Sequence, residues 1–175
     1  MPVFAVTTLA LLLTTFALTS CGFHLRGPVT LAPPLHKLYI HTSTPYSPLT
    51  KNLTQALRAS GVTVTATSKE AITTLDIISE TTNEQLLSVG GTQQTRQYNL
   101  ILTVTFQVLD AAGRTVLPAQ SVTEQRTITI QASQILGGSN ETNILYQQMR
   151  LAIVNDIMIR LSAENAIKAL AKLKP

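Results

Sequence analysis

Apolar and polar residues alternate most regularly between Tyr98 and Leu109, and this period of two predicts a β-strand. One face of such a strand packs on a core while the other carries polar side chains. Asp110-Ala111-Ala112-Gly113 follows and is typical of a hairpin turn. The apolar positions are Tyr98, Leu100, Leu102, Val104, Phe106 and Val108, and the polar positions are Asn99, Thr103, Thr105 and Gln107.

Two further β-prone segments flank this strand. The preceding one runs from Leu75 to about Val89 and ends at the turn signal Gly90-Gly91. After the hairpin, the chain returns through Thr115 to Leu117 and resumes as a strand from Ser121 to Gln131. Pro118 lies between these two pieces and lacks the N–H that a ladder needs, so we expect an edge strand or a bulge there.

The last of these strands carries two charges on its apolar face. Glu124 and Arg126 share that face with Val122, Ile128 and Ile130. Either the two charged side chains pair with each other, or a bulge shifts the register between them. The pattern alone leaves both alternatives open.

The first half of the chain predicts a strand followed by a helix. Lys37 to His41 is a short β-prone run. Ser47 and Pro48 have the types preferred at the N-cap and the first helical position, and Gly61 is typical of a helix end, so we expect a helix over about Pro48 to Ser60. Its apolar face consists of Leu49, Leu53, Ala56 and Leu57.

A second helix is expected near the carboxyl end. Leu136 to Asn140 is interpreted as a flexible segment in which Ser139 or Asn140 caps a long helix from Glu141 to about Leu173. The order of elements, β-α-β-β-β-α, predicts an α+β fold: a two-layer sandwich with an about four-stranded mixed sheet packed by two helices. One face of this sheet is expected to remain free of helices. The apolar side of the second helix is Leu145, Met149, Ile153, Val154, Ile157, Met158 and Leu161.

The amino-terminal segment has a different character. Val3 to Leu18 is apolar and uncharged, so residues 1–20 are interpreted as a signal peptide of the lipoprotein type. Leu18-Thr19-Ser20-Cys21 fits the bacterial lipobox, in which the thiol of Cys21 takes a diacylglycerol; the alternative is a signal that ends beside a stray buried cysteine. Residues 21–34 are expected to form a lipidated tether, and residues 35–175 a single α+β domain. Met1 to Thr8 lacks the usual positive charge, which leaves a start upstream of Met1 open.

Composition adds a modest basic excess. The chain has 13 Lys and Arg against 9 Asp and Glu, a net charge of +4, and every charged residue follows Cys21. Such an excess suits an anionic membrane surface or a phosphate-bearing ligand. With one cysteine, no disulfide can form within the chain. No second stretch is apolar enough to span a bilayer, so lipid alone is expected to anchor the protein.

Candidate chemistry is sparse, and a non-enzyme is predicted. His24, His36 and His41 have neither the spacing of a zinc site nor that of a helical ligand pair. There is no G-x-S-x-G motif and no phosphate loop, so no catalytic, metal-binding or cofactor-binding residue is assigned. Aromatic residues are too few and too dispersed to predict nucleic-acid binding.

The segment from Cys21 to Gly27, Cys-Gly-Phe-His-Leu-Arg-Gly, resembles the mature start of the LPS-assembly lipoprotein family. Further similarities are Gln97 to Leu100, the Asp110 to Gly113 hairpin, Arg126, and a helix that ends near Arg160-Leu161. The resemblance implies an α+β lipoprotein on the periplasmic side of the outer membrane. It also implies a complex with the large β-barrel that exports LPS, in which the lipoprotein plugs the lumen and helps the barrel to assemble.

The resemblance also bears on direct contact with lipopolysaccharide. Family members can carry LPS-contacting basic residues in the turn before the long strand and just before the last helix. In this sequence those places read Val89-Gly90-Gly91-Thr92 and Leu136-Gly137-Gly138-Ser139, without charge. Arg96 and Arg126 are the nearest candidates for LPS contact.

Two hypotheses follow for the free sheet face. If the chain is an LPS-assembly lipoprotein, as the resemblance implies, the polar side chains of this face would suit the polar wall of a large barrel. The alternative is an unrelated outer-membrane lipoprotein that acts as a periplasmic binding module for a small ligand or an envelope polymer, with an ordinary solvated sheet face. The side chains concerned are Thr103, Thr105, Gln107, Thr127 and Thr129.

Overall fold

The structure is a computed structural model that describes residues 31–91, 95–131 and 135–173. The expected signal peptide, the lipid attachment residue Cys21, His24 and the tether up to residue 30 lie outside the described residues. Over the described ranges, no helix combines the length and the hydrophobicity that a membrane crossing requires.

The described part of the chain forms a sheet of five strands in the order β2-β1-β3-β4-β5. Strand β1 (Lys37–Thr42) pairs in parallel with β2 (Thr63–Val64) and with β3 (Thr73–Val89). Strands β3, β4 (Thr95–Asp110) and β5 (Thr115–Gln131) form an antiparallel meander. The predicted α+β class with a mixed sheet is confirmed. The count of about four strands was one too low, because the short β2 adds a parallel edge beside the start of β1.

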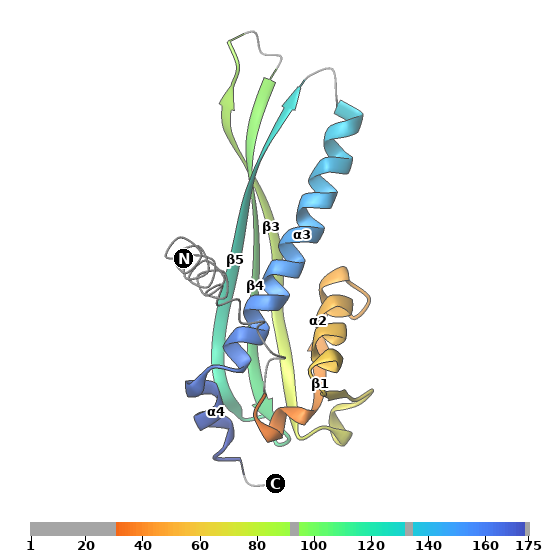
Figure 1. The fold of residues 1–175 in the computed structure, drawn as a ribbon, viewed down its shortest axis with the longest axis vertical. Coiled ribbons are helices and arrows are strands. Elements are labelled where there is room, and N and C mark those ends of the chain that lie inside the picture. The colour runs from red at the N-terminus through yellow and green to blue at the C-terminus, as the bar shows by residue number, and fades with distance from the viewer. Residues whose placement is uncertain (1–30, 92–94, 132–134, 174–175) are drawn as a thin grey trace, which may run out of the picture.

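The three long strands give the molecule its elongated shape (Figure 1). Strands β3 and β5 have 17 residues each, which corresponds to about 55 Å of extended chain. We call the end with the Asp110–Arg114 hairpin the proximal end, and the end where β3 stops at Val89 and β4 starts at Thr95 the distal end. Strands β1 and β2 reach only part of the way from the proximal end, so the distal part of the sheet is a three-stranded ribbon.

Within the described residues, three α-helices lie on one face of the sheet (Figure 1): α2 (Pro48–Ala59), α3 (Ile135–Leu161) and α4 (Glu164–Leu170). The predicted first helix is confirmed. The Oγ atom of Ser47 accepts the amide of Thr50 at 3.2 Å, which caps α2 as expected.

The end of α2 follows from its glycine. Gly61 has φ +82°, and its amide donates to the carbonyl of Arg58 while the amide of Val62 donates to that of Leu57, both at 3.0 Å. This pair of bonds is a Schellman motif, which satisfies the last carbonyls of a helix.

The predicted second helix was wrong at both ends. Helix α3 already begins at Ile135, so Leu136 to Asn140 belongs to the helix rather than to a flexible cap. Interior glycines cost about 1 kcal/mol each, but the packed remainder of α3 supplies the helix nucleus and each added residue contributes a backbone hydrogen bond. At the other end Ala163 is extended (φ −66°, ψ 148°), and a separate helix, α4, starts after it. The hydroxyl of Ser162 bonds to the Ile159 carbonyl, a side-chain bond that competes with helix continuation.

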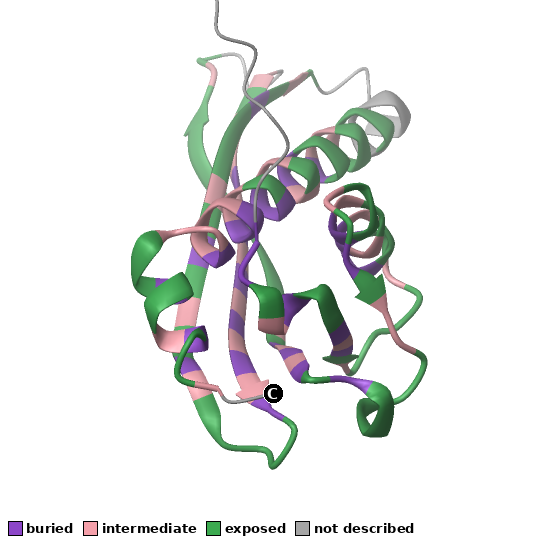
Figure 2. Ribbon diagram, turned by 60° about the horizontal axis from the view of Figure 1, so that its bottom comes forward, coloured by how far each residue is buried: buried purple, intermediate pink, exposed green. Residues whose placement is uncertain are grey.

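The core lies between the helices and the inward face of the sheet, and burial alternates strictly from Asn99 to Asp110 in β4 (Figure 2). Tyr98, the first predicted core position, is only partly buried. The odd-numbered residues from Ile101 to Leu109 are only partly buried and point away from the helices. The largest fully buried side chains are Phe106, Leu35, Leu38, Leu49, Leu53, Leu57, Leu75, Leu100, Leu102, Met149, Ile153 and Ile157.

The folded part begins before residue 35. Leu31 and Ala32 are buried in the core, and Pro33–His36 forms a short 3-10 helix, η1. The hydroxyl of Thr73 on β3 donates to the carbonyl of Pro34 at 3.0 Å. Residues 31–34, which were expected to belong to the tether, are therefore fixed to the proximal end of the sheet.

The register of the meander shifts at four points: between Ile77 and Ser79 and between Leu86 and Ser88 on β3, and between Phe106 and Val108 and between Val108 and Leu109 on β4. In β3, Ile77 pairs with Phe106 but Ser79 pairs with Thr105, so Ile78 is an extra residue. In β5, the register shifts next to Pro118, which lies in an edge strand. Both the edge and the bulge that Pro118 predicted are confirmed.

Candidate functional site

The face of the ribbon that the described helices leave open carries mainly polar and no charged side chains. Hydroxyl and amide groups bond across neighbouring strands: Thr103 to Thr123 at 3.0 Å and Asn99 to Gln125 at 3.3 Å. Cross-strand pairs of this kind stabilise a sheet without any charge. We call this surface the neutral face; it comprises Ser79, Thr81, Asn83, Gln85, Ser88, Gln97, Asn99, Ile101, Thr103, Thr105, Ser121, Thr123, Gln125, Thr127 and Thr129.

The neutral face ends proximally at one carboxylate. Asp76 accepts a hydrogen bond from the amide of Gln107 at 2.8 Å and contacts Nδ1 of His41 at the same distance. Gln107 on β4, Asp76 on β3 and His41 on β1 are neighbours in the strand register. Because both carboxylate oxygens have partners, the border is a closed polar cluster rather than a free charge.

The two described histidines, His36 and His41, lie apart from each other and do not form a cluster. His41 has an exposed ring beside Asp76, and a ring nitrogen of His36 lies 3.2 Å from the carbonyl of Leu31. Among the described residues, no group of three or more His, Cys, Asp and Glu residues is arranged to hold a metal ion.

The opposite side of the distal ribbon contacts α3 through polar groups that no sequence pattern predicted. The Nε atom of Arg150 donates to Oε1 of Glu80 at 2.7 Å, and the hydroxyl of Tyr146 donates to Glu84 at 3.4 Å. Burial raises the pKa of Tyr146, and the negative charge of Glu84 adds to the effect. No local sequence pattern predicts these contacts. Glu80 and Glu84 point toward the helices only because the extra residue Ile78 shifts the alternation of side chains along β3.

Arg126, the first predicted LPS contact, lies on the helix-facing side of β5 opposite Leu100. Its guanidinium is 3.1 Å from Oε2 of Glu124, and its side chain is 47% exposed. The register between Ser121 and Gln131 is regular. Of the two alternatives left open by the sequence, the ion pair is therefore the one that the structure shows.

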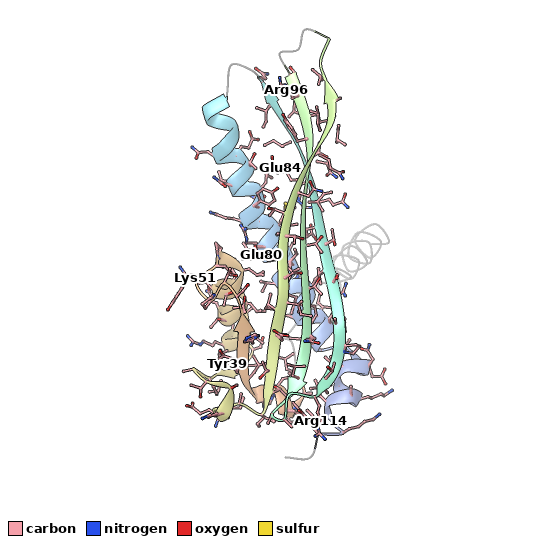
Figure 3. The ribbon with its side chains drawn as sticks, turned by 180° about the vertical axis from the view of Figure 1, so that it is seen from behind. Tyr39, Lys51, Glu80, Glu84, Arg96 and Arg114 are labelled. Carbon is pink, nitrogen blue, oxygen red and sulfur yellow. The ribbon has the colours of Figure 1, made fainter. Side chains whose placement is uncertain are left out.

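Arg96, the second predicted contact, lies at the distal end of β4 between Val89 and Ile130 (Figure 3). It is exposed and forms no ion pair with a residue that the structure describes. Arg96 and Arg126 are on the same side of the sheet, four positions apart along β4, or about 13 Å. The structure thus gives them a common side but does not bring them together in one cluster.

The predicted hairpin at the proximal end is confirmed, and Asp110 organises it. Its Oδ1 accepts the amides of Ala112 at 2.9 Å and Arg114 at 2.8 Å, while Oδ2 accepts from Nε of Arg114 at 2.7 Å. Gly113 has φ +79°, as the turn requires. These hydrogen bonds, led by that from the Arg114 amide, hold the pKa of Asp110 below its usual value.

Solved structures of bacterial lipoproteins share this fold. Lipoprotein B from Nitrosomonas europaea is similar with a TM-score of 0.67 and 22% identity, over 81% of this chain and 91% of that one. A minor lipoprotein from Acinetobacter baumannii is similar with a TM-score of 0.62 and 23% identity, over 73% of this chain and 91% of that one. At this level of identity the likeness concerns the fold.

Sequence comparison reaches further. LPS-assembly lipoprotein LptE from Photorhabdus laumondii is 31% identical over 168 residues, covering 95% of this chain and 91% of that protein. The relative of the same description from Yersinia enterocolitica is 35% identical over 131 residues; the match covers 74% of this chain but only 62% of that protein, less than two thirds of its length. The model of the LptE family, described as lipopolysaccharide-assembly, matches residues 35–161. This chain belongs to the LptE lipopolysaccharide-assembly family.

Proposed function

We propose that this chain is an outer-membrane lipoprotein that forms a complex with the large β-barrel LPS translocon, plugs it and helps it to assemble. In this role it supports the insertion of LPS into the outer leaflet, and its action is physical rather than catalytic. Family membership supports the proposal, since the relatives are LPS-assembly lipoproteins. Residues 1–20 would direct export, and a lipid on Cys21 would hold the folded domain on the periplasmic side of the membrane.

The neutral face is the observation that most directly supports a role as a plug in the barrel lumen. The lumen of a large outer-membrane barrel is polar, and a plug must bury its own surface against that wall. Burying an unpaired charge is strongly unfavourable, whereas hydroxyl and amide groups can exchange water for wall groups at little net cost. A face with many hydroxyls and amides and no charge satisfies this requirement.

The length of the ribbon also supports the proposal. Strands of 17 residues correspond to about 55 Å, whereas the apolar band of an outer-membrane barrel is about 25 Å tall. The ribbon is long enough to pass through such a lumen from the periplasmic opening. The proximal end, with the chain entry at Leu31, would remain on the periplasmic side.

Within this proposal, Arg96 and Arg126 are candidate contacts to the phosphates of lipid A. Arg96 is exposed and forms no ion pair with a residue that the structure describes. Arg126 already shares its charge with Glu124. We therefore assign the larger contribution to Arg96.

The first test is affinity purification of the full-length lipoprotein from native outer membranes in mild detergent, followed by mass spectrometry. The proposal expects a β-barrel at near-stoichiometric yield. Recovery of the lipoprotein alone would instead favour a periplasmic binding module that uses the same open sheet face.

A substitution on the neutral face sharpens this test. Thr123 is exposed on the edge strand β5, so Thr123→Lys should leave the fold intact. We expect Thr123→Lys to lower the recovered barrel at least fivefold, because it buries an unpaired charge in the interface. Thr123→Asn is the matched control at the same position and should keep the wild-type yield. Equal yields from both variants would remove the neutral face from the interface.

A further inference from the structure

The proximal end carries a hollow of about 620 Å³ that basic and apolar side chains line together. Arg114 and Lys172 line it together with Ile72 and Leu173, and Ile72 is 39% exposed. Figure 2 brings this end forward, and Figure 3 labels Arg114 there. Asp110 also lines the hollow, but its charge is already matched by Arg114 at 2.7 Å. Cations beside exposed apolar side chains are characteristic of surfaces that meet a membrane interface.

The basic character continues around the hollow. The carbonyl of Lys37 accepts the amide of Ile72 at 2.9 Å, and Lys69 lies three residues before Ile72 in the short 3-10 helix η2 (Ser68–Glu70). Both lysines are exposed, as is Lys172, and none of the three forms an ion pair with a described residue. Glu70, the exposed carboxylate in the same 3-10 helix, forms no ion pair with a described residue and offsets one of these three charges.

The other acidic groups of this end do not offset the surplus. Asp110 is paired with Arg114, and Glu164 is paired with Lys168 at 2.6 Å. Each of these carboxylates therefore cancels one neighbouring cation. The three lysines, offset in part by Glu70, remain as a net positive surface.

The chain enters the fold at this same end. Pro34 accepts a hydrogen bond from Thr73, and Thr73 is the register partner of Asp110, which lines the hollow. Leu31 is thus held close to the hollow. Ten residues, 21–30, separate Leu31 from the start of the mature chain proposed above, and they can span at most about 35 Å. A lipid on Cys21 would therefore keep the proximal end near the bilayer.

The geometry points to a second membrane contact: the proximal end docks on anionic phospholipid headgroups of the leaflet that holds the acyl chains of Cys21. This inference rests on the lipid anchor of the proposed function. Headgroup phosphates meet the unpaired Lys37, Lys69 and Lys172, while Ile72 and Leu173 face the headgroup–acyl boundary. An exposed cation close to an anionic surface contributes about a fivefold preference for that surface.

The test uses the full-length lipidated protein in nanodiscs that contain either phosphatidylglycerol with phosphatidylcholine or phosphatidylcholine alone. Hydrogen–deuterium exchange is read by mass spectrometry. We expect the amides of residues 70–72 and 111–114 to exchange at least threefold more slowly in the anionic nanodiscs. The difference should vanish at high salt and in the double variant Lys69→Gln/Lys172→Gln. Lys51→Gln, which removes a positive charge from α2, is the control and should retain it.

Each outcome decides a different point. Equal exchange rates in the two kinds of nanodisc overturn the docking on anionic headgroups. If the rates are equal and slow in both, the proximal end contacts lipid through its apolar side chains without recognising the headgroup charge. An unmodified Cys21 in the intact mass would overturn the docking and the anchor together. Co-purification of the β-barrel is measured on the same variants. We expect Lys69→Gln/Lys172→Gln to retain the barrel, so a failed docking test is distinguishable from a failed plug.

Discussion

The Nε atom of Arg150 on α3 lies 2.7 Å from Oε1 of Glu80 on β3, and their side chains are 19% and 15% exposed. This ion pair joins the helix layer to the ribbon beyond the end of β1, where the sheet is narrower. Because both groups are largely removed from water, the pair fixes the position of α3 more than it adds net stability.

Replacing one partner of this pair should therefore be costly, and replacing both should not. We expect Arg150→Met to lower the free energy of unfolding by about 2 kcal/mol, because Glu80 loses its partner in a mostly buried site. Glu80→Leu/Arg150→Met should lie within about 1 kcal/mol of wild type. Urea unfolding of the full-length protein followed by circular dichroism measures both. A double variant as unstable as the single one would show that the pair itself is strongly stabilising.

The hairpin carboxylate predicts a pH dependence. Asp110 has a lowered pKa in the folded state, so its contribution is present above the unfolded pKa, about 3.9, and is lost as pH falls through the folded value. In Asp110→Asn, the free energy of unfolding should be lower at pH 7 and should fall less steeply below about pH 4. Urea unfolding between pH 2 and pH 7 compares the two slopes. Equal slopes would mean that Asp110 does not carry this acid sensitivity.

The glycine at the end of α2 offers a test of backbone conformation. Gly61 has φ +82° and nothing near its hypothetical Cβ, so Gly61→Ala changes backbone strain without a clash. We expect a loss of about 1 kcal/mol in the free energy of unfolding. Gly91→Ala is the control, because Gly91 also has open space but no left-handed backbone. Losses of equal size in both variants would contradict the Schellman explanation.

The two candidate LPS contacts predict different combinations of effects. Arg96→Gln should weaken LPS capture by the purified complex severalfold and leave unfolding unchanged, since Arg96 forms no ion pair within the described residues. Arg126→Gln should reduce capture less and also lower stability, because it leaves Glu124 without its partner. Arg58→Gln removes an exposed cation from α2 and is the control. Wild-type capture by Arg96→Gln would exclude Arg96 as a contact.

The sequence predicted elements whose signals are local. Alternation along β4 identified the buried Leu100 to Val108 face, and Ser47 and Gly61 marked both ends of α2. The Asp110 turn was predicted from its residue types alone. In each case the deciding interactions lie within a few residues, so the one-dimensional pattern contains them.

What the sequence did not predict depends on distant contacts. The break at Ser162 separates two segments that are both good helix formers, and it turns Ala166 and Leu170 toward the core. Strand β2 has two residues and exists only through its pairing with β1. The ion pair of Glu80 crosses 70 residues of sequence. None of these features has a local pattern from which it could be read.

The extra residue at Ile78 has a consequence for how this gene can change. In β3, Leu75 and Ile77 precede Ile78 and point toward the core, whereas Glu80 and Glu84 follow Ile78 and point toward α3. Deleting a single codon at this point would invert every later side chain of β3, exposing the two carboxylates on the neutral face. A compensating insertion further along the strand would restore only the residues beyond it. Length changes within the first half of β3 are therefore far more damaging than most substitutions there, and viable insertions and deletions should be confined to the turns at its ends.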